Sequence, residues 1–119
     1  MRKGYEKMTQ KEVKEILTNY KADRDEIEQI QKAVECMKKW NIDIDEQPTK
    51  EDLERLQMQK EKIINLIALV PDQKQKRVLT YRYIDNMSFN RIAEKMFYSV
   101  DSIFRIHRNA IRAIATIKK

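Results

Sequence analysis

The chain has 119 residues, among them one glycine, two prolines and one cysteine. This length suits one domain, or a small domain with a helical extension. Few helix breakers and many helix-favouring residues predict an all-α fold. Because Cys36 is alone, an internal disulfide is excluded, and without a signal-peptide pattern we expect a cytoplasmic protein. The longest apolar run, residues 63–70, is too short to cross a bilayer, so no membrane partner is expected.

The net charge of +6 is distributed unevenly along the chain. Residues 1–70 hold 14 Lys and Arg against 15 Asp and Glu, whereas residues 71–119 hold 11 against 4. All of the excess positive charge therefore lies in the C-terminal part. A basic segment beside a neutral one indicates a polyanionic partner for the basic segment, although many small proteins are basic without such a partner.

A long helix is predicted over residues 10–39. It follows the capping-box pattern from Thr9 to Glu12, in which two side chains satisfy backbone N–H groups of the first turn. Asp23 is the one polar member of an otherwise apolar stripe at spacings near three and four, which is typical of heptads. The apolar members are Val13, Ile16, Tyr20, Ile27, Ile30, Val34 and Met37.

A second helix is predicted over residues 50–70, with Thr49 as its N-cap and Pro71 as its end. One face of it carries Leu53, Leu56, Ile63, Ile67 and Val70. A short connection between two helices favours an antiparallel hairpin. Two alternatives follow: the apolar stripes cover each other, or the longer helix also pairs with a second subunit in a homodimer.

Three shorter helices are predicted in the basic part, over residues 73–84, 88–96 and 100–117. Their N-caps are Asp72, Ser88 and Ser99, and Asn86 is suited to a left-handed turn. A short helix, a turn and a second capped helix form a helix-turn-helix pattern, which needs a small residue where the helices cross. Ala93 is that residue, and the apolar inner faces hold Ile92, Met96, Ile103 and Ile106.

Residues 78–96 resemble the first part of region four of bacterial sigma factors, and residues 99–111 are similar to its recognition helix. Within that superfamily the chain resembles phage regulators of the ArpU and RinA type, whose recognition helices carry a run like that from Phe104 to Arg108. The resemblance covers residues 66–114, and Phe97 stands where the family often has glycine. It implies a phage or prophage transcriptional regulator that binds double-stranded DNA and acts on late genes for packaging and lysis.

This resemblance divides the chain into residues 1–48, a helical extension for self-association, and residues 49–119, a DNA-binding domain like sigma region four. Two other functions stay open. A small terminase subunit also joins a helix-turn-helix to a helical oligomerisation segment. A sigma-like factor or adaptor would bind bacterial RNA polymerase, although the chain lacks the aromatic-rich promoter-melting region of a complete sigma factor.

The last predicted helix is expected to lie in the major groove with its N-terminal residues at the base edges. The residues expected to read bases are Val100, Asp101, Ser102, Phe104, Arg105 and Asn109. The resemblance places four of these, Asp101, Ser102, Phe104 and Arg105, at base-contacting positions. An acid can accept from cytosine N4, an arginine can bond guanine O6 and N7, and a phenyl ring can contact a thymine methyl.

A second set of residues is expected to bind phosphates, which position a protein on DNA without specifying sequence. These residues are Ser88, Arg91, Lys95, Ser99, Arg108 and Arg112. The alternative for each charged member is an ordinary solvated surface charge. His107, the single histidine, is expected either at a phosphate or merely at the surface.

Enzyme function is not expected from this sequence. One glycine cannot build a glycine-rich phosphate loop, and no cysteine or serine pairs plausibly with His107. A lone histidine and a lone cysteine do not predict a metal site. We therefore expect no catalytic residue, no metal and no cofactor.

Overall fold

The computed structural model describes residues 8–42 and 47–116, and within them every regular element is a helix. The all-α prediction is therefore confirmed. In chain order the helices are α1 (Gln10–Lys39), α2 (Lys50–Ala68), α3 (Gln73–Leu79), the π-helix η1 (Thr80–Ile84), α4 (Phe89–Met96) and α5 (Val100–Thr116). Residue 117, the predicted end of the last helix, lies outside the described residues. No helix in the described ranges is long and apolar enough to span a membrane.

The helices begin at the polar residues that the sequence offers as caps. Thr9 and Thr49 each close a capping box, in which the threonine hydroxyl accepts from the backbone three residues on and an acid returns the bond. Asp72 and Ser88 accept the same type of backbone bond at the starts of α3 and α4. These bonds satisfy N–H groups that have no partner within their own helix.

The larger core joins the first half of α1 to α2, η1 and α5. From α1 it takes Val13, Leu17 and Tyr20, of which Val13 and Leu17 are completely buried. The expected stripe contained Ile16 in place of Leu17, but Ile16 is only half-buried at the edge of this core. Because this core includes side chains from both sides of residue 48, the first half of α1 packs as part of the same body as α5.

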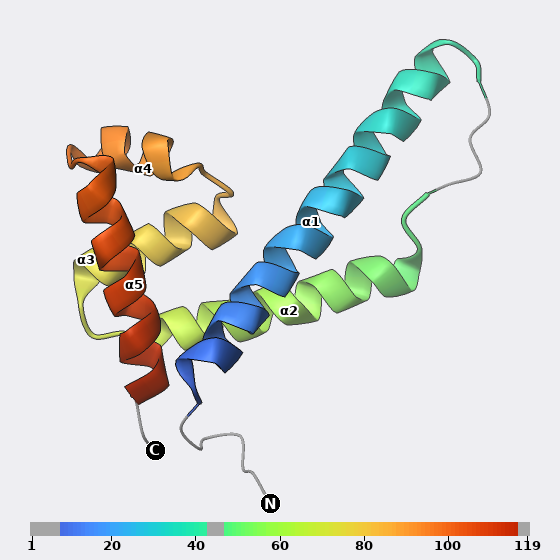
Figure 1. The fold of residues 1–119 in the computed structure, drawn as a ribbon. Coiled ribbons are helices and arrows are strands. Elements are labelled where there is room, and N and C mark those ends of the chain that lie inside the picture. The colour runs from blue at the N-terminus through green and yellow to red at the C-terminus, as the bar shows by residue number, and fades with distance from the viewer. Residues whose placement is uncertain (1–7, 43–46, 117–119) are drawn as a thin grey trace, which may run out of the picture.

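The hairpin of α1 and α2 is open at its far end (Figure 1). Near the core, Ile63, Ile67 and Val70 are buried as expected, although α2 ends at Ala68 and Val70 lies just beyond it. Toward the connection the helices diverge, so Leu53 is 42% exposed instead of covered. Trp40, at the end of α1, is 74% exposed.

Residues 73–84 form two helical segments instead of the single α-helix predicted for them. After α3 the backbone widens into η1, whose end is marked by a bond of 3.0 Å from the Asp85 N–H to the Thr80 carbonyl oxygen. Asn86 then adopts a left-handed conformation with φ 56°, as its residue type suggested. The chain can therefore turn sharply into α4.

Helix α1 holds this wide turn from outside. The guanidinium of Arg24 donates to the carbonyl oxygens of Tyr83 and Ile84 at 2.9 and 2.7 Å. Lys21 bonds both Asp25 and the side chain of Asn86, at 3.1 and 3.2 Å. Carbonyl groups at the end of η1 that lack helical partners are thus satisfied by a cation.

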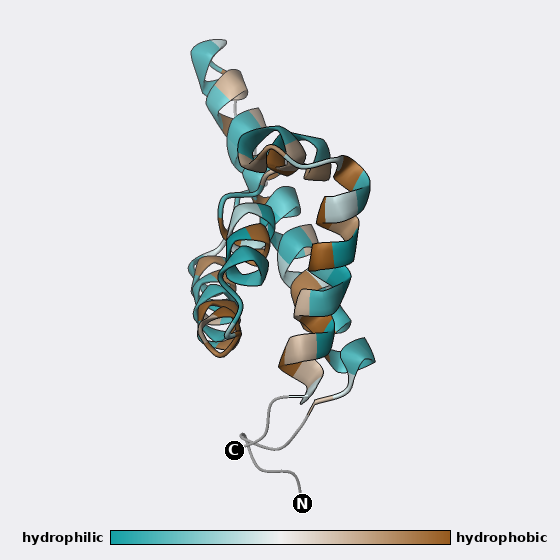
Figure 2. Ribbon diagram, turned by 90° about the vertical axis from the view of Figure 1, so that its left-hand side faces the viewer, coloured by the Kyte–Doolittle hydropathy of each residue, from teal (hydrophilic) through white to brown (hydrophobic). Residues whose placement is uncertain are grey.

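The second core lies between α3, α4 and α5. Its buried members are Val78, Ile92, Ala93 and Ile103. Ala93 leaves room for the two helices to approach, and α4 and α5 are joined through the short connection of residues 97–99. Apolar and polar residues alternate around the helices accordingly, which keeps the polar faces outward (Figure 2).

Replacing Arg24 with alanine should lower the free energy of unfolding by about 1–3 kcal/mol, because two partly buried carbonyl groups lose a charged donor. Urea unfolding followed by circular dichroism measures this change. Arg55→Ala is the matched control, since Arg55 bonds only the exposed Asp52 side chain and should cost no more than about 0.5 kcal/mol. Equal losses for the two variants would contradict the role given to Arg24.

Candidate nucleic-acid interface

One face of α5 is a charged and exposed stripe. Asp101, Arg105, Arg108 and Arg112 follow one another at spacings of four, three and four residues, which places them on one side of a helix with 3.6 residues per turn. All four are exposed, while Ile103, Ala110 and Ile114 on the opposite side are buried. No ion pair neutralises the three arginines within the part of the chain that the structure describes. We call these four residues the α5 stripe.

The first turn of α5 is organised by its serines. The Ser99 hydroxyl oxygen accepts from the Ser102 N–H at 3.2 Å, and the two hydroxyl groups lie 2.9 Å apart. Both residues expected at DNA are thus also used in the cap, although a hydroxyl keeps further hydrogen-bonding capacity. The cap holds Ser99 beside Asp101, at the end of the α5 stripe.

Two residues expected to read bases are less accessible than the outward face suggested. Val100 is half-buried against the second core, so its side chain is turned partly inward. Asn109 is also half-buried, since it lies on the flank of α5 next to the buried Ala110. The α5 stripe therefore carries most of the exposed surface that was expected on this helix.

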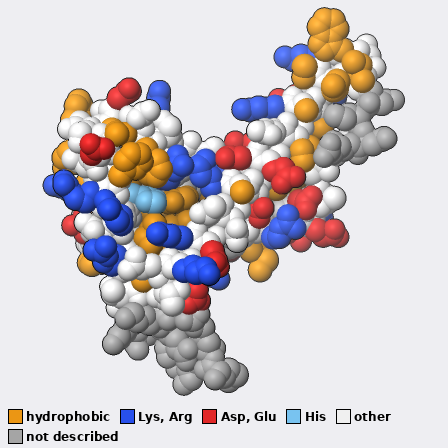
Figure 3. Space-filling model, in the orientation of Figure 1, with side chains coloured by type: hydrophobic (Ala, Val, Ile, Leu, Met, Phe, Trp, Pro, Cys, Tyr) orange, Lys and Arg blue, Asp and Glu red, His pale blue; other side chains and the backbone are white. Residues whose placement is uncertain are grey.

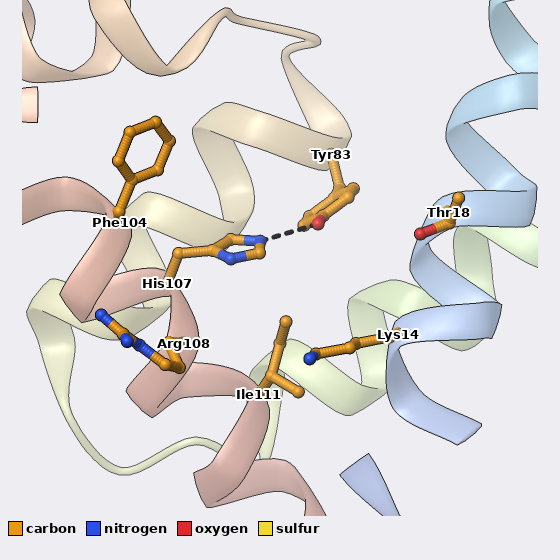
Figure 4. Close-up of a pocket in the computed structure, with 7 residues that line it drawn as sticks. All are labelled: Lys14, Thr18, Tyr83, Phe104, His107, Arg108 and Ile111. Atoms are coloured by element: carbon orange, nitrogen blue, oxygen red, sulfur yellow. Dashed lines mark hydrogen bonds between the residues drawn. The ribbon is translucent and has the colours of Figure 1, made fainter. Parts of the chain in front are cut away.

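Phe104 lies at the border between the α5 stripe and a hollow. Its ring packs edge-on against Phe89 of α4, with ring centroids 4.9 Å apart, and it stays 44% exposed. The hollow, of about 480 Å³, opens between α1 and α5 (Figure 4). Its lining consists of Lys14 and Thr18 from α1, Tyr83 from η1, and Phe104, His107, Arg108 and Ile111 from α5.

His107 lies at the base of this hollow and neither contacts solvent freely nor waits for a phosphate. Its Nε2 lies 2.7 Å from the Tyr83 hydroxyl, and its ring meets Phe89 edge-on at 5.1 Å. Burial, followed by the nearby charges of Arg82 and Lys14, lowers the pKa of His107 to about 4. Burial likewise raises the pKa of Tyr83 to about 12, so both groups are neutral near pH 7.

The phosphate-binding candidates of α4 lie apart from the α5 stripe. Ser88 caps α4 through a bond of 3.1 Å from the Arg91 N–H, and both residues are exposed. Lys95 is exposed as well, with its ammonium 5.4 Å from the centre of the Tyr81 ring. No hydrogen bond or ion pair joins these three residues to the α5 stripe in the described ranges. Arg108 and Arg112, by contrast, belong to it.

The charges of the surface agree with the division seen along the sequence. Lys and Arg side chains gather around the single histidine on the lobe that contains α5, whereas Asp and Glu are more frequent along the arm of α1 and α2 (Figure 3). Among the described residues, no group of three or more His, Cys, Asp and Glu could hold a metal ion. The chemistry available on this lobe is therefore the binding of an anion.

Some residues of this region were absent from the sequence-based set. Lys14, Thr18, Tyr83 and Ile111 line the hollow, but they come from segments far apart in the chain. Lys14 and Thr18 are four residues apart and so share a face of α1, which was the one available signal. Nothing in the sequence indicated that this face lies beside α5.

Phe97 ends α4 in the left-handed conformation, with φ 60° and ψ 41°, and its side chain is 93% exposed. Such a conformation costs a residue with a Cβ roughly 1–2 kcal/mol, part of which glycine loses again as chain entropy. Phe97→Gly should therefore stabilise the protein by roughly 0.5–1 kcal/mol in thermal or urea unfolding. Phe97→Ala keeps the Cβ, and an equal gain for that variant would show that backbone strain is not the cause.

Acid should destabilise the protein through His107. In the unfolded chain its pKa is near 6.5, and in the folded protein it is about 4, so between these pH values the unfolded state binds more protons. The free energy of unfolding should fall as the pH drops from 7 to 4, by about 1–3 kcal/mol more than in His107→Gln. Urea titrations of both proteins at several pH values measure this difference, and parallel curves would contradict it.

Comparison with protein-family models, with characterised proteins and with solved structures gives no match to this chain. The function is therefore argued from the geometry and chemistry of the α5 stripe and its surroundings.

Proposed function

We propose that this chain is a sequence-specific DNA-binding regulator of transcription that inserts α5 into the major groove. The observation that carries the proposal is the α5 stripe, with three exposed and unpaired arginines on the face opposite a buried apolar side. A helix with its side chains is about 10–12 Å wide, and the major groove is about 12 Å wide. An exposed, basic helix that is fixed to a core from behind suits that groove.

The way in which α5 is supported favours the same function. Reading base edges requires a helix whose direction is fixed, because a small rotation would move an arginine away from its base. Helix α5 packs against the second core through Ile103 and against the larger core through Ala110 and Ile114. The resemblance of residues 78–111 to sigma region four supports the transcriptional role.

Individual residues of the α5 stripe suit different tasks. Arg105 lies in the second turn, where its guanidinium can bond guanine O6 and N7 together, and Asp101 can accept from cytosine N4. Arg108 and Arg112 lie further along the helix and suit phosphates on the strands. Phe104 keeps an exposed edge for a thymine methyl while its ring rests on Phe89.

The partner proposed for this surface is double-stranded DNA, and the compartment that follows from it is the cytoplasm of a bacterial or phage-infected cell. Self-association through the far half of α1 and contact with RNA polymerase stay predictions of the sequence. The exposed Trp40 and Leu53 at the open end of the hairpin are where a second subunit would be sought first.

The test is selection of duplexes from a randomised library, followed by fluorescence anisotropy with the selected and with scrambled duplexes. Wild type should enrich a motif and prefer it, and its affinity should fall steeply with salt. Arg105→Ala should lose about 1–3 kcal/mol of affinity for the selected site and accept other bases at one position, because a bidentate base contact is lost.

Lys62→Ala serves as the control, since Lys62 is an exposed lysine of α2. This variant should keep both the motif and the affinity of wild type. If wild type enriches no motif and its binding is insensitive to salt, the proposed function is wrong.

A further inference from the structure

The hollow between α1 and α5 is electrically one-sided. Among its lining residues the charged ones are Lys14 and Arg108, and none is Asp or Glu (Figure 4). Lys14 is exposed and forms no ion pair with any residue in ranges 8–42 and 47–116. The hollow therefore presents an uncompensated cation from α1 opposite one from α5.

The hollow is continuous with the α5 stripe. Arg108 belongs to both, and Phe104 lies between the hollow and Arg105. On the α1 side of α5, the next polar side chains are those of Lys14 and Thr18, one turn apart on the same face of α1. A molecule bound along the α5 stripe would thus meet α1 at these two residues.

The geometry of a major groove says what would pass there. Since a helix nearly fills the width of the groove, the two strand backbones run along its flanks. Backbone phosphates need donors that are charged or that carry a hydroxyl group, and Lys and Thr supply both kinds. The position of Lys14, beside α5 and at the level of Arg108, matches a phosphate of the flanking strand.

We propose that α1 is part of the DNA interface, with Lys14, assisted by Thr18, binding a phosphate of the strand that runs along the hollow. This inference rests on the proposed function and extends it, because the N-terminal helix was expected only to support the domain or to self-associate. The contact positions the protein on the duplex and reads no base.

The larger core makes this assignment mechanically sound. Val13 and Leu17, the neighbours of Lys14 and Thr18 in the sequence, are completely buried against α5 and α2. The first half of α1 therefore cannot move away from α5 without opening the core. Lys14 keeps its place beside the α5 stripe before DNA arrives, so little ordering of the backbone is needed on binding.

The experiment measures binding of the full chain to its selected duplex and to a scrambled duplex between 50 and 200 mM KCl. Lys14→Ala should reduce the slope of log affinity against log salt by about 0.9, the value for one phosphate contact on duplex DNA. Over that fourfold range of salt, wild type should lose roughly 3.5-fold more affinity than the variant. The preference for the selected duplex should not change.

Two further variants complete the test. Lys32→Ala removes an exposed lysine from the far half of the same helix and should leave the slope unchanged. Lys14→Arg keeps the charge and should restore the slope. Circular dichroism melting of each variant shows that the fold is kept.

The outcomes separate the two proposals. If wild type binds DNA and selects a motif but Lys14→Ala has the wild-type slope, α1 does not contact the strand and the proposed function stands. A lower preference for the selected duplex in Lys14→Ala would also overturn the assignment, because a phosphate contact carries no sequence information. If wild type itself binds no duplex, both proposals fall together.

Discussion

The position of α5 depends on the burial of the first half of α1 beneath it. Val13, Leu17 and Tyr20 fill the space between α5 and α2, and without them Ala110 and Ile114 would face water. Each large apolar side chain buried in this way contributes about 1.5–3 kcal/mol. Since α3, α4 and η1 form only a small second core, the larger core is what holds the charged helix in one orientation. The N-terminal segment is thus a structural part of the lobe that carries the basic surface.

The sequence was sufficient for those features that depend on neighbouring residues. Capping side chains marked where the helices begin, and the left-handed turn at Asn86 followed from its residue type. The small Ala93 and the apolar faces around it were likewise visible from spacing alone. Each of these features is decided within one or two helical turns, which is the range over which periodicity and capping carry information.

Features that depend on contacts between distant segments were not predictable in this way. The π-helix requires Arg24 of α1 at the carbonyl groups of Tyr83 and Ile84, and no local pattern announces that meeting. The pairing of His107 with Tyr83 has the same origin, and so does the half-buried state of Val100. The candidate site was predicted along α5, where helix periodicity applies. It was not predicted across to Lys14, where only the packing of α1 decides the neighbours.

The wide turn of η1 has a consequence for the length of the chain. In an α-helix the Asp85 N–H would bond the carbonyl of Tyr81, but here it bonds that of Thr80, so the turn holds one residue more than an α-helical turn. Deleting one residue between 80 and 84 would allow a regular helix and would rotate everything after it by about 100° relative to α3. The side chain opposite His107 would then be a different one. In related chains, the number of residues between α3 and α4 is therefore as informative as their identity, and an alignment that places a gap there compares helices in different rotational settings.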